Sequence, residues 1–273
     1  SPEMPAVCLV NGIAGAAVDP LDRGLQYGDG VFRTLRVEDG QPRWLNEQLE
    51  KLAADATALG IPVPAASLWR EDLGRLSGKL SQGVLRLSLT RGTGARGYRC
   101  PAAANPTRIM IYDPTPPLSD HWPATGLHVH LCDLRLSEQP RLAGIKHLNR
   151  LENVLARSEW DDAEVHEGVL RDLHDRVVSG VMSNLFFWRG ARLCTPRLDR
   201  CGVAGVTRAR LLRRAAEAGM AIEEGDFDLA EVLAADEVML CNSVFGLRRV
   251  TRLGSHHWPH PLISARLSAL LDD

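Results

Sequence analysis

The chain has 273 residues, enough for one large domain or two ordinary ones, and its 45% hydrophobic and 24% charged residues are typical of a globular protein. A formal net charge of −2, with acidic and basic residues interspersed, argues against nucleic acid or a membrane surface as partner and favours small-molecule chemistry. Six scattered cysteines indicate a reduced, cytoplasmic protein, and neither a membrane-spanning run nor a secretory signal is evident.

The first half of the chain is predicted to alternate short strands and helices. Strand-like segments lie at 6–12, 31–38, 83–92 and 107–113. The dipeptide Asp39-Gly40 predicts a hairpin turn after the second of them. A helix with Asn46 as its N-cap is expected to run until Gly60, because its apolar residues keep a helical period, and a second helix is expected near 67–80.

The proline-rich segment 114–126 predicts a connector between two domains, so we expect an N-terminal domain at 1–113 and a C-terminal domain at 127–273. In the second half, strands are expected at 127–136, 167–172, 176–190 and 237–246. Helices are expected at 149–160, 206–218, 229–234 and 261–271. The first of these carries three apolar residues on one side, namely Leu151, Val154 and Leu155.

Lys146 is one of only three lysines in a chain that otherwise uses arginine for its positive charges. A primary amine differs from guanidinium because it can lose its proton and form an imine. The position of Lys146, between the apolar pair Gly144-Ile145 and a helix start, predicts partial burial, which favours the neutral amine. The alternative on this local pattern is a surface lysine whose stem packs along the helix.

Two polar segments are candidates for binding an anion. Two glycines precede Val206 and Thr207 at a predicted helix start, where backbone N–H groups, a hydroxyl and the helix dipole suit a phosphate, although the same pattern is typical of a tight loop. Ser243 follows a strand and is either a second phosphate donor or a turn residue. Ser183 and Asn184 precede an apolar strand and are also typical of a bulge.

Four segments together resemble the fold-type IV pyridoxal-phosphate enzymes. They are DRGLQYGDGVFRTLRV, RLAGIKHLNRLENVLAR, the Ser-Asn-Leu-Phe strand and TPRLDRCGVAGVTR, in this order over nearly the whole chain. The family contains branched-chain and D-amino-acid aminotransferases and aminodeoxychorismate lyases, and TRGTGARGY, LAGIKHLNRLE, TPRLDRCGV and ADEVMLCN are most similar to the lyases. The resemblance implies an α/β (α+β) fold with a smaller N-terminal α/β domain, a larger C-terminal pseudo-barrel domain that binds the cofactor, and a homodimer whose loops complete each other's sites.

The resemblance also implies roles for individual residues. Lys146 matches the lysine that forms an aldimine with pyridoxal 5'-phosphate. Val206 and Thr207 match the helix-start pair that binds the cofactor phosphate, Ser243 matches a further phosphate contact, and Lys51 stands where many members place a phosphate-binding arginine. The implied reaction converts 4-amino-4-deoxychorismate to 4-aminobenzoate, a folate precursor, and pyruvate, with Lys146 removing and donating the proton.

Ser179 departs from the family pattern. Five residues before Asn184, the family usually carries a glutamate beside the pyridine nitrogen of the cofactor, where a carboxylate keeps that nitrogen protonated and strengthens the electron sink. Serine only hydrogen-bonds, so either the sink is weaker or a neighbour such as Glu167, or a water, helps. Transamination should suffer more from this change than a lyase reaction that ends in an aromatic ring.

The two carboxylates of the implied substrate favour arginine as their partner. The candidates are Arg96 in the loop GARGY and Arg33 in VFRT, with Tyr98 and Thr34 close by in the sequence, and each is equally compatible with a solvated position. Two rival functions remain open. One is an aminotransferase of the same fold acting on branched-chain or D-amino acids, and the other is a noncatalytic homologue that binds the cofactor as a structural ligand, against which the retention of Lys146 argues.

The segment SHHWPH near the C-terminus gathers three histidines, His256, His257 and His260, which suggests a metal. No acidic or cysteine partner lies at ligand spacing, and a polar loop before the last helix accounts for them. We therefore expect no metal, and we expect a small-molecule substrate rather than nucleic acid or a membrane as partner.

Overall fold

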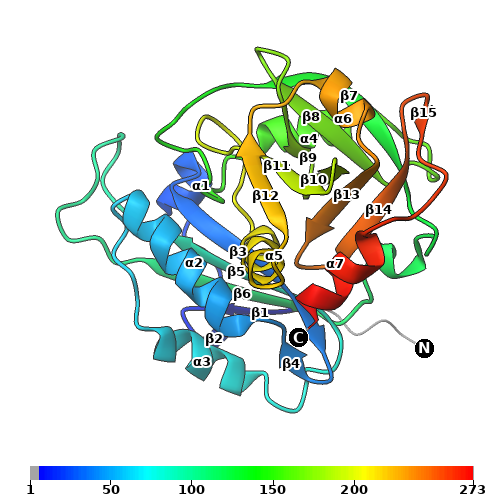
Figure 1. The fold of residues 1–273 in the computed structure, drawn as a ribbon. Helices are drawn as coiled ribbons and strands as arrows, with labels where there is room; N and C mark the ends of the chain where they lie inside the picture. The colour runs from blue at the N-terminus through cyan, green and yellow to red at the C-terminus, as the bar shows by residue number, and fades with distance from the viewer. Residues whose placement is uncertain (1–5, 273) are drawn as a thin grey trace. The chain divides into compact units, whose positions relative to one another are not determined.

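The computed structural model describes residues 6–272. They form two compact units (Figure 1). The first comprises the described chain up to Pro117 together with Ile145–Asn149, and the second comprises Leu118–Gly144 and the chain from Arg150 onward. The chain thus changes unit inside the proline-rich segment, between the two predicted domains. It then returns to the first unit over residues 145–149, which the sequence prediction had placed in the second domain.

The first unit contains a six-stranded antiparallel sheet with the order β2-β1-β6-β5-β3-β4. Its strands are β1 (Val7–Val10), β2 (Ile13–Ala14), β3 (Gly30–Glu38), β4 (Gln41–Pro42), β5 (Gly83–Thr90) and β6 (Thr107–Asp113). Asp39 and Gly40, with φ of 50° and 76°, form the predicted hairpin turn between β3 and β4. Its helices are α1 (Arg23–Tyr27), α2 (Leu45–Ala58) and α3 (Ala66–Arg75).

Helices α2 and α3 lie in front of this sheet in Figure 1 and bury their apolar residues against one of its faces. The core they share with the sheet includes Leu49, Leu52, Ala56, Trp69, Leu35, Leu85 and Leu87. The prediction that Asn46 caps α2 is wrong, because the N-cap is Trp44 with φ of 56°, and Asn46 lies in the first turn and accepts a hydrogen bond from Arg70. Helix α3 ends at Arg75, five residues before the predicted end.

The second unit contains a nine-stranded mixed sheet with the order β12-β11-β10-β13-β14-β7-β8-β9, and β15 pairs with β14. Its strands are β7 (Leu127–Leu136), β8 (Glu167–Asp172), β9 (Val177–Gly180), β10 (Asn184–Arg189), β11 (Arg192–Pro196), β12 (Ala221–Gly225), β13 (Glu237–Asn242), β14 (Gly246–Leu253) and β15 (His256–His257). The edge strand β9 is joined to the distant strand β10 by residues 181–183 alone, a span of roughly 10 Å. The sheet must therefore curl back on itself, as expected for a pseudo-barrel.

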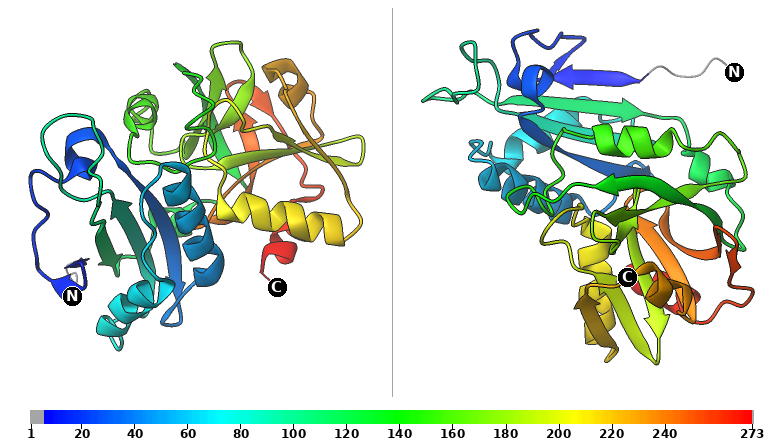
Figure 2. Two further views of the ribbon diagram at one scale, coloured as in Figure 1. Left: turned by 90° about the vertical axis from the view of Figure 1, so that its left-hand side faces the viewer. Right: turned by 90° about the horizontal axis from the view of Figure 1, so that it is seen from above.

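The helices of this unit are η1 (Leu118–His121), α4 (Leu151–Arg157), α5 (Val206–Glu217), α6 (Leu229–Leu233) and α7 (Ser264–Leu271). Helices α5 and α7 lie side by side (Figures 1 and 2), and α5 also packs against β12 and β13. Asp228 caps α6 and forms a capping box with Glu231. None of the helices within residues 6–272 has the length and apolar character needed to cross a bilayer.

Two of the predicted strands are shorter in the structure, for local reasons. The strand expected at 176–190 is interrupted at 181–183, because the side chain of Glu167 accepts hydrogen bonds from this turn. The strand expected at 237–246 stops at Asn242, whose side-chain oxygen accepts hydrogen bonds from the N–H groups of Val244 and Phe245 and so forms a turn.

Candidate active site

The segment 145–149 pairs with the edge of β3 that β4 leaves free. The Phe32 N–H donates to the Lys146 carbonyl at 3.0 Å, and the Leu148 N–H donates to the Gly30 carbonyl at 3.1 Å. The segment therefore acts as a short added strand, which fixes the backbone from which the Lys146 side chain extends.

A buried carboxylate on α2, Asp55, links this lysine segment to two cations. Asp55 accepts the Lys146 N–H at 3.1 Å, the Lys51 Nζ at 2.7 Å and a guanidinium nitrogen of Arg33 at 3.4 Å. Burial lowers the pKa of Arg33 to about 10, and the charge of Asp55 opposes that effect. Arg33 is thus a buried, ion-paired residue, and the solvated position considered for it does not apply.

Strand β3 presents alternate side chains to the two faces of its sheet. Arg33 lies on the helix-covered face, together with the core residues Val31 and Leu35. Phe32 and Thr34 lie on the opposite face. Arg33 and Thr34 are the two predicted substrate contacts on this strand. Only Thr34 lies on the same face of the sheet as Phe32, opposite the helices.

The face opposite the helices carries two cations around one aromatic ring. The Lys146 Nζ lies 4.7 Å from the centre of the Phe32 ring, and the Arg86 guanidinium lies 4.0 Å from it. Arg86 on β5 is paired in register with Thr34. Sequence reasoning missed Arg86, although the alternation of polar and apolar residues along LRLSL in β5 placed it on a polar face. This face can bind an anionic substrate next to a primary amine.

Arg96 and Tyr98 belong to the loop between β5 and β6, and both are exposed. The Tyr98 ring, 83% exposed, lies edge-on to the Tyr27 ring with 5.1 Å between their centres. Among residues 6–272, no hydrogen bond or ion pair of the Arg96 side chain is found. The loop therefore presents a guanidinium and a phenol at the surface of the first unit.

Two hydroxyls meet at the N-terminus of α5. Thr207 is buried, and its Oγ1 lies 3.1 Å from the Oγ of Ser243, which follows β13. The first intrahelical hydrogen bond runs from the Ala209 N–H to the Gly205 carbonyl, so the N–H groups of the first turn precede the helical ladder. The structure thus brings together the predicted phosphate residues Val206, Thr207 and Ser243, whereas Lys51 belongs to the first unit.

Asn184 shapes the loop that leads into α5. Its Nδ2 donates to the Val203 carbonyl at 2.7 Å, and its Oδ1 accepts the Gly205 N–H at 3.2 Å. A Cβ at position 205 would lie 2.6 Å from that oxygen, so only glycine fits there without a shift of the asparagine. The asparagine of the Ser-Asn-Leu-Phe strand and a glycine of the segment TPRLDRCGVAGVTR are therefore direct partners.

Ser179 lies on β9, where it is paired in register with Leu170 of β8, and Glu167 begins β8 three residues earlier. The Ser179 hydroxyl donates to the Gly180 carbonyl at 2.8 Å. Glu167 is fully buried, and its carboxylate accepts the Met182 N–H at 3.0 Å and the Ser183 hydroxyl at 2.8 Å. Burial raises the pKa of Glu167, while the hydrogen bonds that it accepts oppose that effect. The carboxylate therefore fixes the turn between β9 and β10 that separates Ser179 from Asn184.

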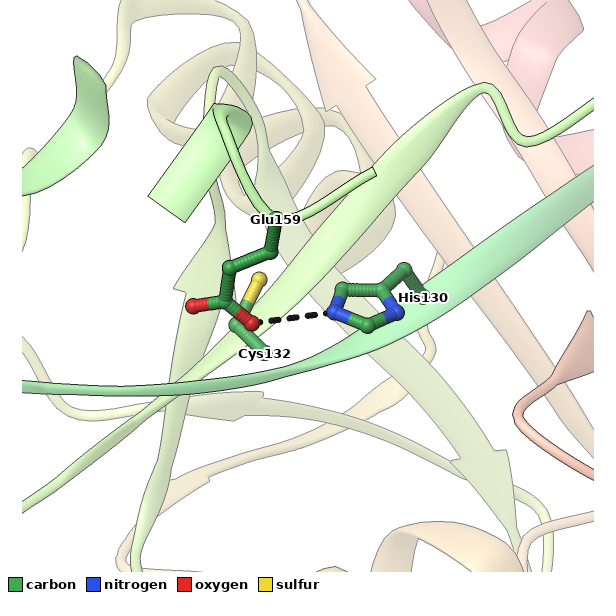
Figure 3. Close-up of side chains that lie close together, drawn as sticks. All are labelled: His130, Cys132 and Glu159. Atoms are coloured by element: carbon green, nitrogen blue, oxygen red, sulfur yellow. Dashed lines mark hydrogen bonds and ion pairs between the residues drawn. The ribbon is translucent and has the colours of Figure 1, made fainter. Parts of the chain in front are cut away.

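His130 and Cys132 on β7 form a cluster with Glu159, which follows α4 (Figure 3). The candidate ligand atoms of His130, Cys132 and Glu159 lie within 4.8 Å of one another. The Glu159 carboxylate already accepts the N–H groups of Asp133 and Leu134, and contacts His130 Nε2 at 3.0 Å. Burial raises the pKa of the Cys132 thiol to about 12, which keeps it protonated. Hydrogen bonds within the protein already occupy the Glu159 carboxylate. We therefore interpret the cluster as a support for the irregular part of β7 and not as a metal site.

The amino-transferase class IV family model matches residues 30–253, and the chain belongs to this family. An aminodeoxychorismate lyase of Vibrio harveyi is 35% identical over 250 residues, covering 90% of this chain and 91% of the relative. The crystal structure of 4-amino-4-deoxychorismate lyase from Pseudomonas aeruginosa is 46% identical, with a TM-score of 0.92 and coverage of 97% and 98% of the two chains. A branched-chain amino acid aminotransferase of Escherichia coli, 20% identical with a TM-score of 0.82, covers 96% and 91% and shares the fold. These structures confirm the expected fold class.

Proposed function

We propose that this protein is a 4-amino-4-deoxychorismate lyase that uses pyridoxal 5'-phosphate to form 4-aminobenzoate and pyruvate, in the synthesis of a folate precursor. The observation that carries the proposal is the 46% identity to the lyase of Pseudomonas aeruginosa over 97% of this chain, against 20% to the aminotransferase of Escherichia coli. An aminotransferase of the same family is the alternative, and it predicts a different product from a different substrate.

The residues of the chain suit this cofactor. The N-terminus of α5 offers N–H groups outside the helical ladder and the paired hydroxyls of Thr207 and Ser243, a donor set that fits a phosphate. Lys146 offers a primary amine, and Lys51 is the second cation that we assign to the cofactor. When bound, the cofactor supplies an electron sink for charge that develops on the substrate carbon. Ser179 is proposed to meet its pyridine nitrogen by hydrogen bonding alone.

Lys146 is the proposed base and acid of the reaction. Its Nζ removes the proton from the ring carbon that carries the substrate amine, and loss of the enolpyruvyl oxygen from the ring then leaves an aromatic product. The same Nζ returns the proton to the methylene carbon of the released enolpyruvate, which becomes pyruvate. Asp55 contributes by holding the Lys146 backbone N–H at 3.1 Å and the Lys51 ammonium at 2.7 Å.

The substrate carboxylates are proposed to meet Arg96, Tyr98 and Thr34, to which we add Arg86 on the face of the sheet that carries the Lys146 amine. Arginine suits this task because its planar fork pairs with both oxygens of a carboxylate. Arg33 makes a buried pair with Asp55, so we propose that it acts through that carboxylate and not by touching the substrate.

We also propose that the protein is a cytoplasmic homodimer. All six cysteines are free thiols, which suits a reducing compartment. Helix α4 exposes Leu151, Val154 and Leu155, at 74%, 56% and 59%, on one side. Three large apolar residues at helical spacing favour coverage by another protein surface, and a second copy of this chain is the partner that the family resemblance implies.

The test is to incubate the holoenzyme with 4-amino-4-deoxychorismate and to measure 4-aminobenzoate by fluorescence and pyruvate by coupled oxidation of NADH. We expect equimolar products, no turnover by Lys146→Ala, and near-normal turnover by the control Lys79→Ala, whose lysine is exposed. Borohydride reduction followed by peptide mapping should mark Lys146. Amino-group exchange with branched-chain or D-amino acids, without 4-aminobenzoate, would replace the lyase proposal by the aminotransferase.

A further inference from the structure

Arg23 of α1 binds the loop between β5 and β6 through three consecutive carbonyls. It is only 4% exposed. One terminal nitrogen donates to the Gly97 carbonyl at 3.0 Å and to the Arg99 carbonyl at 3.3 Å, and the other donates to the Tyr98 carbonyl at 2.8 Å. Residues 97–99 form neither helix nor strand, so these hydrogen bonds replace the missing ladder partners of the loop backbone.

The guanidinium of Arg23 is itself held in place. Its Nε donates to Asp29 Oδ2 at 2.9 Å, and the Nε of Arg91 donates to the same oxygen at 2.7 Å. Arg91 also donates to the carbonyls of Gly60 and Leu59, at 2.9 and 2.7 Å, where α2 has ended. Both arginines are buried and share one carboxylate, so the orientation of Arg23 is set by the body of the first unit and not by the loop.

Gly97 is fixed from two sides. Its carbonyl accepts from Arg23 at 3.0 Å, and its N–H donates to the Tyr27 hydroxyl at 3.2 Å. Its φ of 105° is a backbone conformation that favours glycine. The residues on either side are Arg96 and Tyr98, the two that we assign to substrate binding. The backbone between these two side chains is thus held in one conformation by α1.

We propose that Arg23 is a positioning residue for substrate binding, which fixes the carbonyls of residues 97–99 so that Arg96 and Tyr98 meet the substrate in one preformed arrangement. This inference rests on the proposed function, because it takes those two side chains as substrate contacts. A loop ordered in advance loses less conformational entropy when the ligand binds, so its loosening weakens binding more than it slows the chemical step.

A guanidinium is required for this role, because its planar fork reaches three acceptors while its Nε still pairs with Asp29. Lysine at position 23 would keep the positive charge next to the carboxylate but could not reproduce this geometry with a single amine. Arg23 is the arginine of the segment DRGLQYGD, which carries part of the family resemblance. The resemblance gave this arginine no role, and the proposal assigns it one.

The experiment compares Arg23→Lys with the control Arg70→Lys, which makes the same chemical change at an exposed position of the same unit. For Arg23→Lys we expect the KM for 4-amino-4-deoxychorismate to rise about tenfold or more, with kcat changed less than about threefold. In the same holoenzyme, amide hydrogen exchange at 96–100 and trypsin cleavage after Arg96 should become faster. Asp29→Asn, which removes the carboxylate that orients Arg23, should shift both readouts in the same direction.

The loop measurements need no turnover, so they separate this inference from the proposed function. A wild-type protein that does not convert the substrate overturns the proposed function, and the exchange and cleavage rates still report on Arg23. Unchanged exchange and cleavage in a folded Arg23→Lys would overturn the inference, as would a loosened loop with an unchanged KM. If Arg23→Lys does not fold, Asp29→Asn carries the same outcomes.

Discussion

The three lysines of this chain lie in three different environments. Lys79 is exposed, Lys51 pairs with Asp55 at 2.7 Å, and the Lys146 amine lies 4.7 Å from the centre of the Phe32 ring. Only Lys146 combines a half-buried amine with a backbone pinned to a neighbouring strand. Imine chemistry needs that combination, because the amine must return to one position after each turnover. Under the role that we propose for Lys146, arginine could replace the other two lysines as a charge, but not this one.

Thr207→Val is expected to weaken cofactor binding. The change keeps the shape of the side chain and removes the hydroxyl that lies 3.1 Å from Ser243 at the start of α5. Loss of one hydrogen bond to a charged phosphate should cost about 1.5 to 3 kcal/mol, or about tenfold to a hundredfold in affinity. Equilibrium titration with pyridoxal 5'-phosphate measures it, with Thr251→Val as the control. An unchanged affinity would remove Thr207 from the phosphate site.

Ser179→Glu is expected to favour transamination. A carboxylate beside the pyridine nitrogen would stabilise its protonated form and strengthen the electron sink, so amino-group transfer from simple amino acids should rise about tenfold. Formation of 4-aminobenzoate should change little, because aromatisation already drives it. Parallel assays of both activities, with Ser255→Glu at an exposed position outside α4 as control, test this. If neither activity moves, Ser179 does not face the ring nitrogen.

At the scale of elements, one buried carboxylate organises the turn between β9 and β10. Glu167 on β8 accepts hydrogen bonds from Met182 and Ser183 of that turn, and Asn242 at the end of β13 donates to the Met182 carbonyl at 3.0 Å. The same turn leads into Asn184, which holds the loop before α5. The elements that carry the predicted cofactor residues of the second unit are therefore connected through polar side chains in the curled sheet.

Glu167→Gln is expected to destabilise the protein, because the amide presents donors to a group of backbone N–H donors and leaves part of them unsatisfied, at a cost of about 1 to 3 kcal/mol. Burial raises the pKa of Glu167 in the fold, so the unfolded chain releases this proton first. Its contribution to stability is therefore present below the ordinary glutamate pKa and is lost as the pH rises through the raised value. The difference in the free energy of unfolding between the wild type and Glu167→Gln should therefore shrink as the pH rises above 4.

Thermal unfolding of both proteins at several pH values measures that difference. Ser158→Gln serves as a control at an exposed position, where no pH-dependent difference is expected. A difference that grows from pH 4 to 7 would mean that the carboxylate is stabilised in its charged form and that its hydrogen bonds outweigh burial.

Sequence patterns predicted most of the elements, and contacts between separate segments explain most of the failures. The strand at 127–136 and the helix beginning at Val206 lie where the periodicity placed them. The prediction missed β11, which forms a hairpin with β10, and β12, whose partner β11 lies 29 residues away. It also ran one strand through 176–190, because nothing in that segment reports that Glu167 interrupts it. Long-range contacts decided the cases of β12 and of the interrupted strand, and periodicity within a window does not contain them.

The candidate residues followed the same rule. The motif around Thr207 was found because a helix start and its glycines are local features. Asp55, Arg86 and Arg23 were not anticipated as part of the site, because their roles depend on contacts with segments 54 to 91 residues away in the sequence, as between Asp55 and Lys146. Sequence reasoning also offered Arg33 as a possible solvated charge, and only the helix over that face of the sheet shows that it is buried.

At the scale of the whole molecule, each unit supplies a different part of the proposed chemistry. The first unit carries the Lys146 amine and the loop with Arg96, and the second carries the start of α5 that we propose for the cofactor phosphate. The chain returns to the first unit over residues 145–149, where His147 forms a bridge with Val31 of β3. The proposed function therefore assigns residues of both units, and the family resemblance adds the loops of a second copy.

A double substitution on α4, Leu151→Glu with Leu155→Glu, is expected to convert the proposed homodimer into monomers. These residues lie one turn apart on the exposed apolar side of α4, so two carboxylates would have to be buried without partners in any interface that covers them. Sedimentation should give about twice 29.9 kDa for the wild type and 29.9 kDa for the variant. Because the loops of the partner are expected to complete the site, the variant should also lose turnover. Leu118→Glu, which alters a residue that is 82% exposed outside α4, should remain dimeric and active. A wild type that sediments as a monomer, or a double variant that stays dimeric, would contradict this assignment of α4.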